Sequence, residues 1–259
     1  MTPTDTRSGD DVLTTESLWI RRAVRESAAL RLICLPYGGG GASAFNALTR
    51  ALPESVEVVA VQLPGREERY WEELPQDPRF LVRACAVALR PYCTTPFAFY
   101  GHCAGALLAY EVACEMEDRF GLRPLHLVAG AQAAPHVASA EPPLHELSDD
   151  EFVDVLRKRG GLPGEVLSNT ALLTFLLPRI RADFTMWERY APRTRTALPY
   201  PVTTLRGSGD TLLERAQVES WRSYTTAEFA DREVDGGHLF IIDNAEDSAR
   251  ALTEVLSVD

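Results

Sequence analysis

The chain alternates short apolar runs with longer segments in which apolar residues recur every three or four positions. Mostly apolar runs of a few residues are typical of strands covered on both faces. They predict strands at Leu30–Leu35, Val56–Gln62, Phe97–Tyr100, Leu125–Ala129, Val202–Arg206 and Glu228–Val234. Helical spacing predicts helices at Ala42–Ala51, Pro78–Tyr92, Ala104–Phe120 and Ala245–Leu256. This alternation indicates an α/β fold with a mostly parallel central sheet and helices on both faces.

The alternation stops after Pro135, and roughly 60 residues separate the fourth predicted strand from the fifth, too many for a simple crossover. Three helical stretches fill this interval: Ser148–Arg159, Glu165–Asn169 and Ala171–Tyr190. Ser148 and Glu151 have the spacing of a capping box. We therefore expect a helical lid insertion at about residues 136–192, over the edge of the sheet where ligands bind in such folds.

Composition favours a single soluble domain. The 259 residues are 46% hydrophobic and 24% charged, and no linker-like segment divides them. The polar residues 1–17 are expected to be disordered or frayed, which leaves 18–259 as the domain. A net charge of −11 argues against binding to nucleic acid or anionic lipid. Without a signal peptide or a membrane-spanning run, a cytoplasmic monomer is expected.

The five cysteines are an odd number, and none are spaced as Cys-x-x-Cys. Neither a disulfide framework nor a metal site is therefore indicated. The four in apolar stretches are expected to be small buried side chains, namely Cys34, Cys85, Cys93 and Cys114.

The fifth cysteine lies in Gly101-His102-Cys103-Ala104-Gly105, between a predicted strand and a predicted helix. A nucleophile on such a sharp turn has a strained backbone, and glycines two residues away on each side leave the space that the turn needs. The helix N-terminus also favours a thiolate over a thiol. Cys103 is thus the candidate nucleophile, and the alternative is a tight turn with a buried cysteine.

A nucleophile of this kind needs a base, and the base needs an orienting acid. His238 lies in a glycine-flanked loop between the last strand and the last helix, which matches the chain order of an α/β-hydrolase fold. The other histidines fit less well. His102 is expected to point away from Cys103, His126 opens a strand, and His136 and His145 lie at the edge of the lid.

The orienting acid should follow a strand between nucleophile and base. Asp210 does so, in the turn after Val202–Arg206, although a solvated turn aspartate is the simpler alternative. Asp235 is too close to His238 and is assigned an ordinary turn role. The Gly38–Gly41 run lacks a phosphate-loop signature. It is instead expected to supply the N–H of Gly38, beside that of Ala104, to an oxyanion.

These motifs resemble the type II thioesterases, free-standing editing enzymes of polyketide and nonribosomal peptide synthesis. The resemblance runs nearly end to end and includes Ser17–Ile20, Pro36–Gly41, Val61–Arg69, Gly101–Gly105, Leu177–Phe184 and Gly236–Phe240. The Pro-Gly-Arg-Glu and Arg-Ala-Asp-Phe segments are its most specific part. It implies a Cys103–His238–Asp210 triad, a helical lid and an acyl thioester on the phosphopantetheine of a carrier protein, with no cofactor of the enzyme's own. Arg181 and Asp183 could form a structural ion pair or contact the substrate, and the structural interpretation is preferred.

The sequence departs from the family pattern at three places. Cys103 replaces the usual serine, Ala104 the usual methionine, and Tyr37-Gly38 the usual His-Ala. An acyl-cysteine is itself a thioester, so passing the group to a second thiol is nearly isoenergetic. Hydrolysis and transfer between carrier proteins therefore both remain open, as does a non-catalytic module that binds carrier proteins.

Overall fold

The computed structural model describes residues 12–137, 143–158, 160–192 and 197–257. An eight-stranded sheet forms its centre, in the order β1-β2-β4-β3-β5-β6-β7-β8. Its strands are β1 (Thr14–Thr15), β2 (Ile20–Arg22), β3 (Leu30–Leu35), β4 (Val56–Val61), β5 (Phe97–His102), β6 (Leu127–Gly130), β7 (Val202–Gly207) and β8 (Phe229–Val234). The six strands from β3 to β8 pair in parallel, which confirms the predicted sheet.

The two strands that the sequence pattern did not predict lie at one edge of the sheet, where β2 pairs antiparallel with β4 and β1 with β2. Strand β2 is only three residues long and contains two arginines, so it has no apolar run. The Arg22 side chain instead pairs with the buried carboxylate of Glu57, which also accepts from Arg31. Part of the segment expected to be frayed is therefore strand β1, whereas residues 1–11 lie outside the described part.

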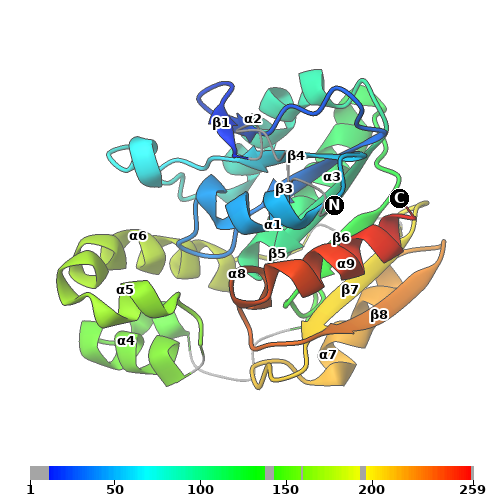
Figure 1. The fold of residues 1–259 in the computed structure, drawn as a ribbon. Coiled ribbons are helices and arrows are strands. Elements are labelled where there is room, and N and C mark those ends of the chain that lie inside the picture. The colour runs from blue at the N-terminus through cyan, green and yellow to red at the C-terminus, as the bar shows by residue number, and fades with distance from the viewer. Residues whose placement is uncertain (1–11, 138–142, 159, 193–196, 258–259) are drawn as a thin grey trace, which may run out of the picture.

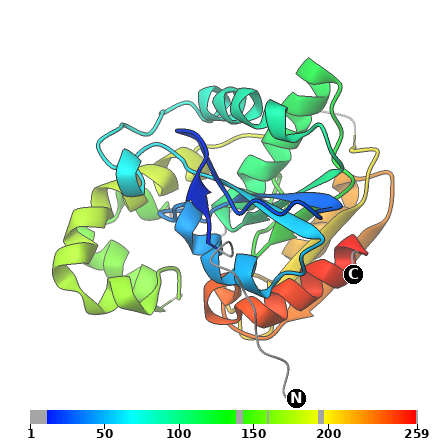
Figure 2. The ribbon, with the colours of Figure 1, turned by 45° about the horizontal axis from the view of Figure 1, so that its top comes forward.

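Helices cover both faces of the sheet (Figures 1 and 2). One face carries α2 (Pro78–Leu89) and α3 (Ala104–Phe120), and the other carries α1 (Asn46–Ala51), α8 (Phe240–Asp243) and α9 (Ala245–Leu256). The short helix α7 (Arg215–Glu219) follows β7. Five 3-10 turns complete the described helices: η1 (Ala42–Phe45), η2 (Glu67–Arg69), η3 (Arg90–Tyr92), η4 (Leu144–Glu146) and η5 (Ser220–Tyr224).

Local sequence explains where these helices begin and end. Asp77 caps α2 by accepting a hydrogen bond from the N–H of Arg79, and Pro78 occupies the first position of that helix. Helix α3 ends at Gly121, whose φ of 66° suits a glycine at a left-handed helix terminus.

The expected insertion contains α4 (Asp149–Lys158), α5 (Gly164–Ser168) and α6 (Thr170–Glu188), which project from one side of the sheet (Figure 1). Ser148 and Glu151 form the predicted capping box at the start of α4. The insertion has its own hydrophobic cluster, formed by Leu144, Phe152, Leu156, Leu162, Leu173, Leu177 and Ile180.

The topology places the candidate residues at one edge of the sheet. Cys103, Asp210 and His238 follow the carboxyl ends of β5, β7 and β8. Because these strands are parallel and are linked through β6, their carboxyl ends meet at the same edge. Open α/β sheets bind their ligands there.

Candidate active site

Cys103 lies on a sharp turn between β5 and α3. Its φ of 52° and ψ of −126° are a strained conformation for a residue with a side chain. The surrounding backbone maintains it, because the Cys103 N–H donates to the carbonyl of Gly130 at 2.8 Å and the Cys103 carbonyl accepts from Ala106 at 2.8 Å. The turn leaves the thiol partly exposed at the N-terminus of a 17-residue helix.

The glycines on either side of the turn allow close backbone packing. A Cβ on Gly101 would lie 2.1 Å from the carbonyl oxygen of Gly105. A Cβ on Gly105 would lie 2.3 Å from the carbonyl oxygen of Leu35 and 2.5 Å from that of Pro36. A side chain at either position would therefore push the turn away from the neighbouring strand.

His238 and Asp210 lie beside the thiol. His238, in the loop between β8 and α8, is 8% exposed and hydrogen bonds to Cys103. Its Nδ1 is 2.9 Å from Oδ2 of Asp210, whose carboxylate is fully buried in the turn after β7. The second oxygen, Oδ1, accepts from the N–H of Leu212 at 2.9 Å, which holds the carboxylate in place. The structure thus brings together the three residues in the predicted chain order.

The charges of this triad support one another. Burial raises the pKa of Cys103, but the positive charge and hydrogen bond of His238 and the N–H of Ala104 outweigh it, so the thiol pKa is lower than usual. Burial lowers the pKa of His238, but the charge of Cys103 and the hydrogen bond that His238 donates to Asp210 raise it to about 10. The two shifts favour a thiolate beside an imidazolium, which is the form in which a cysteine is nucleophilic.

The glycine-rich loop after β3 lies against the turn at Cys103. The position of a Cβ on Gly38 is 4.0 Å from the Cβ of Ala104, which brings the two expected oxyanion donors close together. Gly39 has a φ of +84° and donates its N–H to Asp183 of α6. Helix α6 therefore reaches the candidate site directly.

Comparison with known proteins places this geometry in a family. The family model described as the thioesterase domain matches residues 30–256. The gramicidin S biosynthesis protein GrsT of Aneurinibacillus migulanus is 34% identical over 226 residues, which cover 87% of this chain and 88% of that protein. The thioesterase PikA5 of Streptomyces venezuelae is 34% identical over 243 residues, 93% of this chain and 86% of that protein. The chain belongs to the thioesterase family.

Solved structures show which branch of the family it resembles. The RedJ thioesterase from the prodiginine pathway of Streptomyces coelicolor is 38% identical, with a TM-score of 0.81 over 90% of this chain and 92% of that one. The type II thioesterase BorB, from the borrelidin biosynthetic cluster, is 31% identical, with a TM-score of 0.84 over 94% and 99%. This thioesterase is thus a thioester hydrolase of the type II branch with the α/β-hydrolase fold.

His102 in this thioesterase has a contact that the sequence did not reveal. Its Nδ1 is 2.8 Å from the hydroxyl of Tyr100. Its Nε2 is 2.8 Å from the backbone carbonyl of His238. A carbonyl only accepts, so Nε2 carries the hydrogen and Nδ1 accepts from Tyr100. Burial lowers the pKa of His102 to about 3, so the ring is neutral and connects the nucleophile turn to the loop of His238.

The remaining alternatives have partners elsewhere in the thioesterase. His126 bonds to the hydroxyl of Thr203 at 2.8 Å. His136 stacks on Tyr224, and His145 pairs with Glu188. Asp235 accepts from the hydroxyl of Ser208 at 3.3 Å, in keeping with a turn role.

Arg181 and Asp183 do not form the ion pair with each other that the sequence analysis proposed. Arg181 donates to the carbonyls of His145 and Leu147 and to Asp149, and so holds the start of the insertion. Asp183 points the other way and pairs with Arg66. The two side chains diverge because Arg181 packs within the insertion and Asp183 packs against the body. Their spacing along the helix could not reveal these partners.

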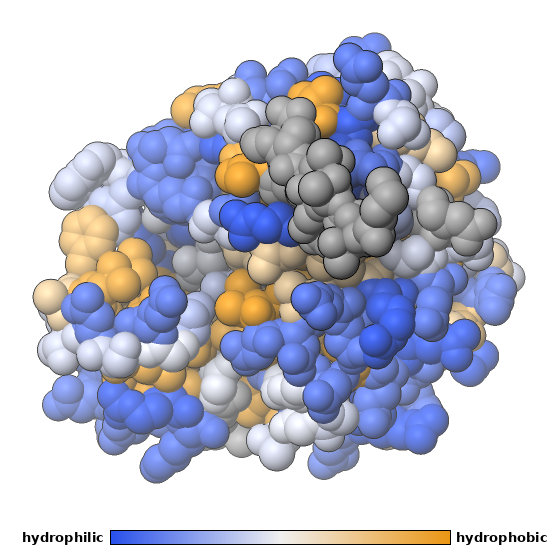
Figure 3. Space-filling model, viewed as in Figure 1, coloured by the Kyte–Doolittle hydropathy of each residue, from blue (hydrophilic) through white to orange (hydrophobic). Residues whose placement is uncertain are grey.

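The two motifs that are most specific to the family therefore meet in space. Besides the Arg66–Asp183 pair, Tyr70 stacks on Phe175 of α6 with ring centroids 3.9 Å apart, and its hydroxyl donates to the Phe175 carbonyl. The adjoining Trp71 is 81% exposed. Apolar residues show on the surface over α5 and α6 (Figure 3). The Pro64–Trp71 segment thus attaches the insertion to the body of the thioesterase.

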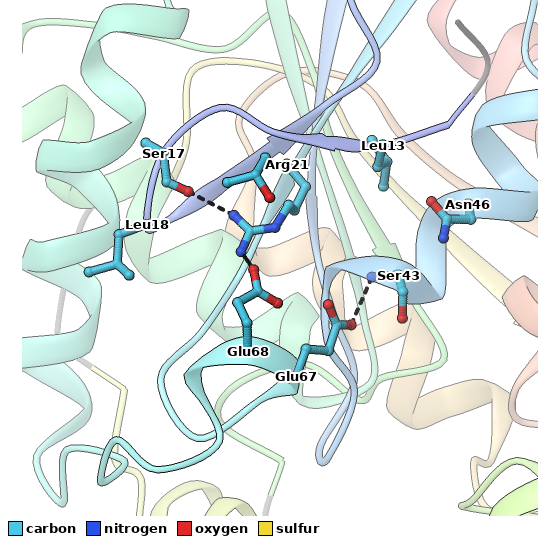
Figure 4. Close-up of a pocket in the computed structure, with 9 residues that line it drawn as sticks. Leu13, Ser17, Leu18, Arg21, Ser43, Asn46, Glu67 and Glu68 are labelled. Atoms are coloured by element: carbon cyan, nitrogen blue, oxygen red, sulfur yellow. Dashed lines mark hydrogen bonds and ion pairs between the residues drawn. The ribbon is translucent and has the colours of Figure 1, made fainter. Parts of the chain in front are cut away.

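A surface pocket of about 460 Å³ lies between β1, β2, η1 and η2 (Figure 4). Within it, Arg21 donates to the carbonyl of Ser17 and pairs with Glu68, while Glu67 accepts from the N–H of Ser43. The described residues that line it include no thiol or imidazole, so it is distinct from the triad. Its contacts connect the edge strands to the η2 segment.

The described residues contain neither a metal-binding cluster nor a membrane-spanning helix. No group of three or more His, Cys, Asp or Glu side chains is arranged there to hold a metal ion. No helix in that part of the chain is long and apolar enough to cross a membrane.

Proposed function

We propose that this thioesterase removes acyl or aminoacyl groups from the phosphopantetheine of carrier proteins in polyketide or nonribosomal peptide biosynthesis. The group passes through a covalent acyl-Cys103 intermediate and is released to water. The observation that supports this is the partly exposed Cys103, whose thiol pKa is lowered by His238, with Asp210 hydrogen bonded to that histidine. The names of its relatives, which include biosynthetic type II thioesterases, suggest the substrate class.

In the first half of the reaction the Cys103 thiolate attacks the thioester carbonyl carbon. The N–H groups of Gly38 and Ala104 stabilise the tetrahedral oxyanion. Collapse breaks the bond to the pantetheine sulfur, which leaves as a thiol after taking the proton of the His238 imidazolium. The products are an acyl-Cys103 thioester and a neutral His238.

In the second half a water molecule attacks the acyl-Cys103 carbonyl and gives its proton to His238. Collapse releases the carboxylic acid and restores the thiolate and imidazolium. Asp210 stays ionised throughout, because burial raises its pKa but the hydrogen bond and charge of His238, together with the N–H of Leu212 and the charge of His102, lower it below its usual value. Its role is to hold the imidazole with Nε2 toward the sulfur.

Transfer to a second carrier protein is the alternative that Cys103 itself favours. A second pantetheine thiol would replace water and give its proton to His238. An acyl-serine is an oxygen ester, more stable than the thioester that formed it, whereas an acyl-cysteine is energetically close to its donor. Transfer to the acceptor thiol is therefore less unfavourable in free energy than it is from an acyl-serine, so the thiol competes better with water.

Labelled acyl carrier protein, incubated with enzyme and a second, empty carrier, separates these outcomes. Free labelled acid supports hydrolysis, and label on the second carrier supports transfer. Cys103→Ser is the matched variant, because it forms an oxygen ester and should reduce transfer far more than hydrolysis.

Cys103→Ala should show no acyl adduct by intact mass while keeping its circular dichroism spectrum. The absence of an adduct on the wild-type enzyme would support the remaining possibility, a non-catalytic module that binds carrier proteins. We expect the active species to be a cytoplasmic monomer, which light scattering after size-exclusion chromatography tests for the purified protein.

A further inference from the structure

Asp183 lies in the second half of α6 and is 3% exposed. Its carboxylate accepts from two donors on different segments of the body, the guanidinium of Arg66 and the backbone N–H of Gly39. The Arg66 side chain is also 3% exposed and donates to the carbonyl of Pro64 at 3.2 Å. A buried carboxylate therefore joins the insertion to the glycine-rich loop that faces Cys103.

The N–H groups of this loop are used unequally. Gly39 donates to Asp183, Gly40 to the carbonyl of Tyr37 at 2.9 Å, and Ala42 to the side chain of Gln62 at 2.7 Å. For the N–H groups of Gly38 and Gly41, the described residues provide no hydrogen-bond acceptor. Of these two glycines, Gly38 packs against Ala104 whereas Gly41 packs against Glu67, so the Gly38 N–H is the donor that lies beside the candidate oxyanion site.

A run of four glycines has many accessible conformations, so a donor within it must be held by its neighbours. The carboxylate of Asp183 holds the peptide plane between Gly38 and Gly39. The preceding plane, which carries the Gly38 N–H, is held through the Tyr37 carbonyl by the N–H of Gly40, so the two restraints together set the direction of the Gly38 N–H. A Cβ on Gly38 would lie 3.7 Å from the Cβ of Asp183 and 3.8 Å from the ring of Phe184, so α6 also packs against Gly38.

We infer that Asp183 is a positioning residue for the oxyanion hole: through Gly39 it orients the N–H of Gly38 toward the tetrahedral oxygen, and Arg66 holds its carboxylate in place. This inference rests on the proposed acyl-Cys103 chemistry and gives the insertion a part in it. The helix that covers the site also sets the geometry of a catalytic donor.

Two reactions of the same sulfur test the inference. Alkylation of Cys103 by iodoacetamide needs the thiolate but forms no oxyanion. Acylation by a small acyl thioester, such as an N-acetylcysteamine thioester, needs the thiolate and also needs the oxyanion to be stabilised. A change in Asp183 should therefore slow acylation and leave alkylation unchanged, whereas general damage to the site slows both.

The variants are chosen to avoid an unpaired buried charge. Arg66→Met with Asp183→Leu removes both charges and the acceptor for Gly39. Acylation should fall about 100-fold, the usual effect of losing one oxyanion donor, with alkylation within about twofold of wild type. Asp183→Asn keeps a weaker, neutral acceptor and should lower acylation about tenfold. Asp149→Ala, which removes an exposed ion pair with Arg181 in the same insertion, is the control and should change neither rate.

Unchanged acylation in the double variant, or an equal fall in both reactions, would overturn the inference. If circular dichroism shows that the double variant does not fold, Asp183→Asn decides by the same two rates. A wild-type enzyme that forms no acyl adduct refutes the proposed function instead, so the two failures are distinguishable.

Discussion

The sulfur of Cys103 differs from a serine hydroxyl because its surroundings favour transfer of its proton to His238. The imidazolium lowers the pKa of the thiol, and the thiolate raises the pKa of the imidazole, so both shifts favour the ion pair. In the proposed reaction His238 therefore serves first as the acid that protonates the leaving thiol, and as a base only once the acyl enzyme has formed.

Replacing His238 with Ala should change how alkylation of Cys103 depends on pH. Loss of the positive charge removes the main cause that lowers the thiol pKa, so the pKa should rise toward or above its ordinary value. Iodoacetamide should react with the variant at least about tenfold more slowly than with wild type at pH 6.5, and the difference should shrink above pH 9. Equal rates at pH 6.5 would mean that His238 does not ionise the thiol.

His102 should affect turnover through the backbone of His238. Replacing it with Leu leaves the His238 carbonyl and the Tyr100 hydroxyl without their partner, which typically costs about 1–3 kcal/mol and frees the loop. We expect kcat to fall about tenfold with little change in KM. His102→Gln, whose amide can still donate to the His238 carbonyl, should retain most of the wild-type kcat. Steady-state kinetics of both variants, with melting temperatures alongside, would refute this role if Gln and Leu behaved alike.

At the scale of elements, the nucleophile turn depends on how closely α3 approaches β3. Gly105 makes this possible because the nearest atoms are backbone oxygens of Leu35 and Pro36, which cannot rotate away. The strain at Cys103 is thus maintained by packing between a helix and a strand rather than by the turn alone.

Gly105→Ala should therefore destabilise the protein by about 3 kcal/mol, at the upper end of ordinary overpacking. For a chain of this size that corresponds to a fall in melting temperature of roughly 6–12 °C. Gly164→Ala is the matched control, since a Cβ there meets no atom within 4 Å, and its melting temperature should be unchanged or slightly higher. Calorimetry on both variants tests this, and equal melting temperatures would contradict the packing argument.

How well the sequence predicted each element depended on how local its signal is. The strands β3 to β8 and the main helices follow apolar runs and helical spacing, and were predicted with small shifts at their ends. Strand β2 was missed because its polar residues are stabilised by Glu57, 35 residues from Arg22. The residues of the proposed triad could be selected because glycines mark Cys103 and His238 locally, whereas Asp183 and Arg66 are 117 positions apart and carry no mark of their pairing.

For the whole molecule, the core itself separates the five thiols into two classes. Four are buried, with Cys34 in the layer of α1 and α9 and Cys85, Cys93 and Cys114 in the layer of α2 and α3. Burial raises the pKa of Cys85 and of Cys93 to about 12. The thiols of Cys85 and Cys93 are therefore not ionised near neutral pH, and all four of these cysteines are buried in the folded protein.

A thiol titration with Ellman's reagent should report this arrangement. The native protein should show one fast-reacting thiol near neutral pH, and the protein unfolded in guanidinium chloride should show all five. Cys103→Ser should abolish the fast native reaction and leave four after unfolding. A second fast thiol in the native protein would show that the core is more open than the packing indicates.

The insertion has a hydrophobic cluster built from its own residues, and its polar contact with the glycine-rich loop is made by one buried carboxylate. It is therefore suited to being swapped as a module between members of the family. A chimera that receives a foreign insertion would need to retain Gly39 and Arg66 in the host and an aspartate at position 183 in the donor. If the three helices are grafted without these partners, the protein should fold, but the Gly38 N–H should no longer be oriented toward the oxyanion.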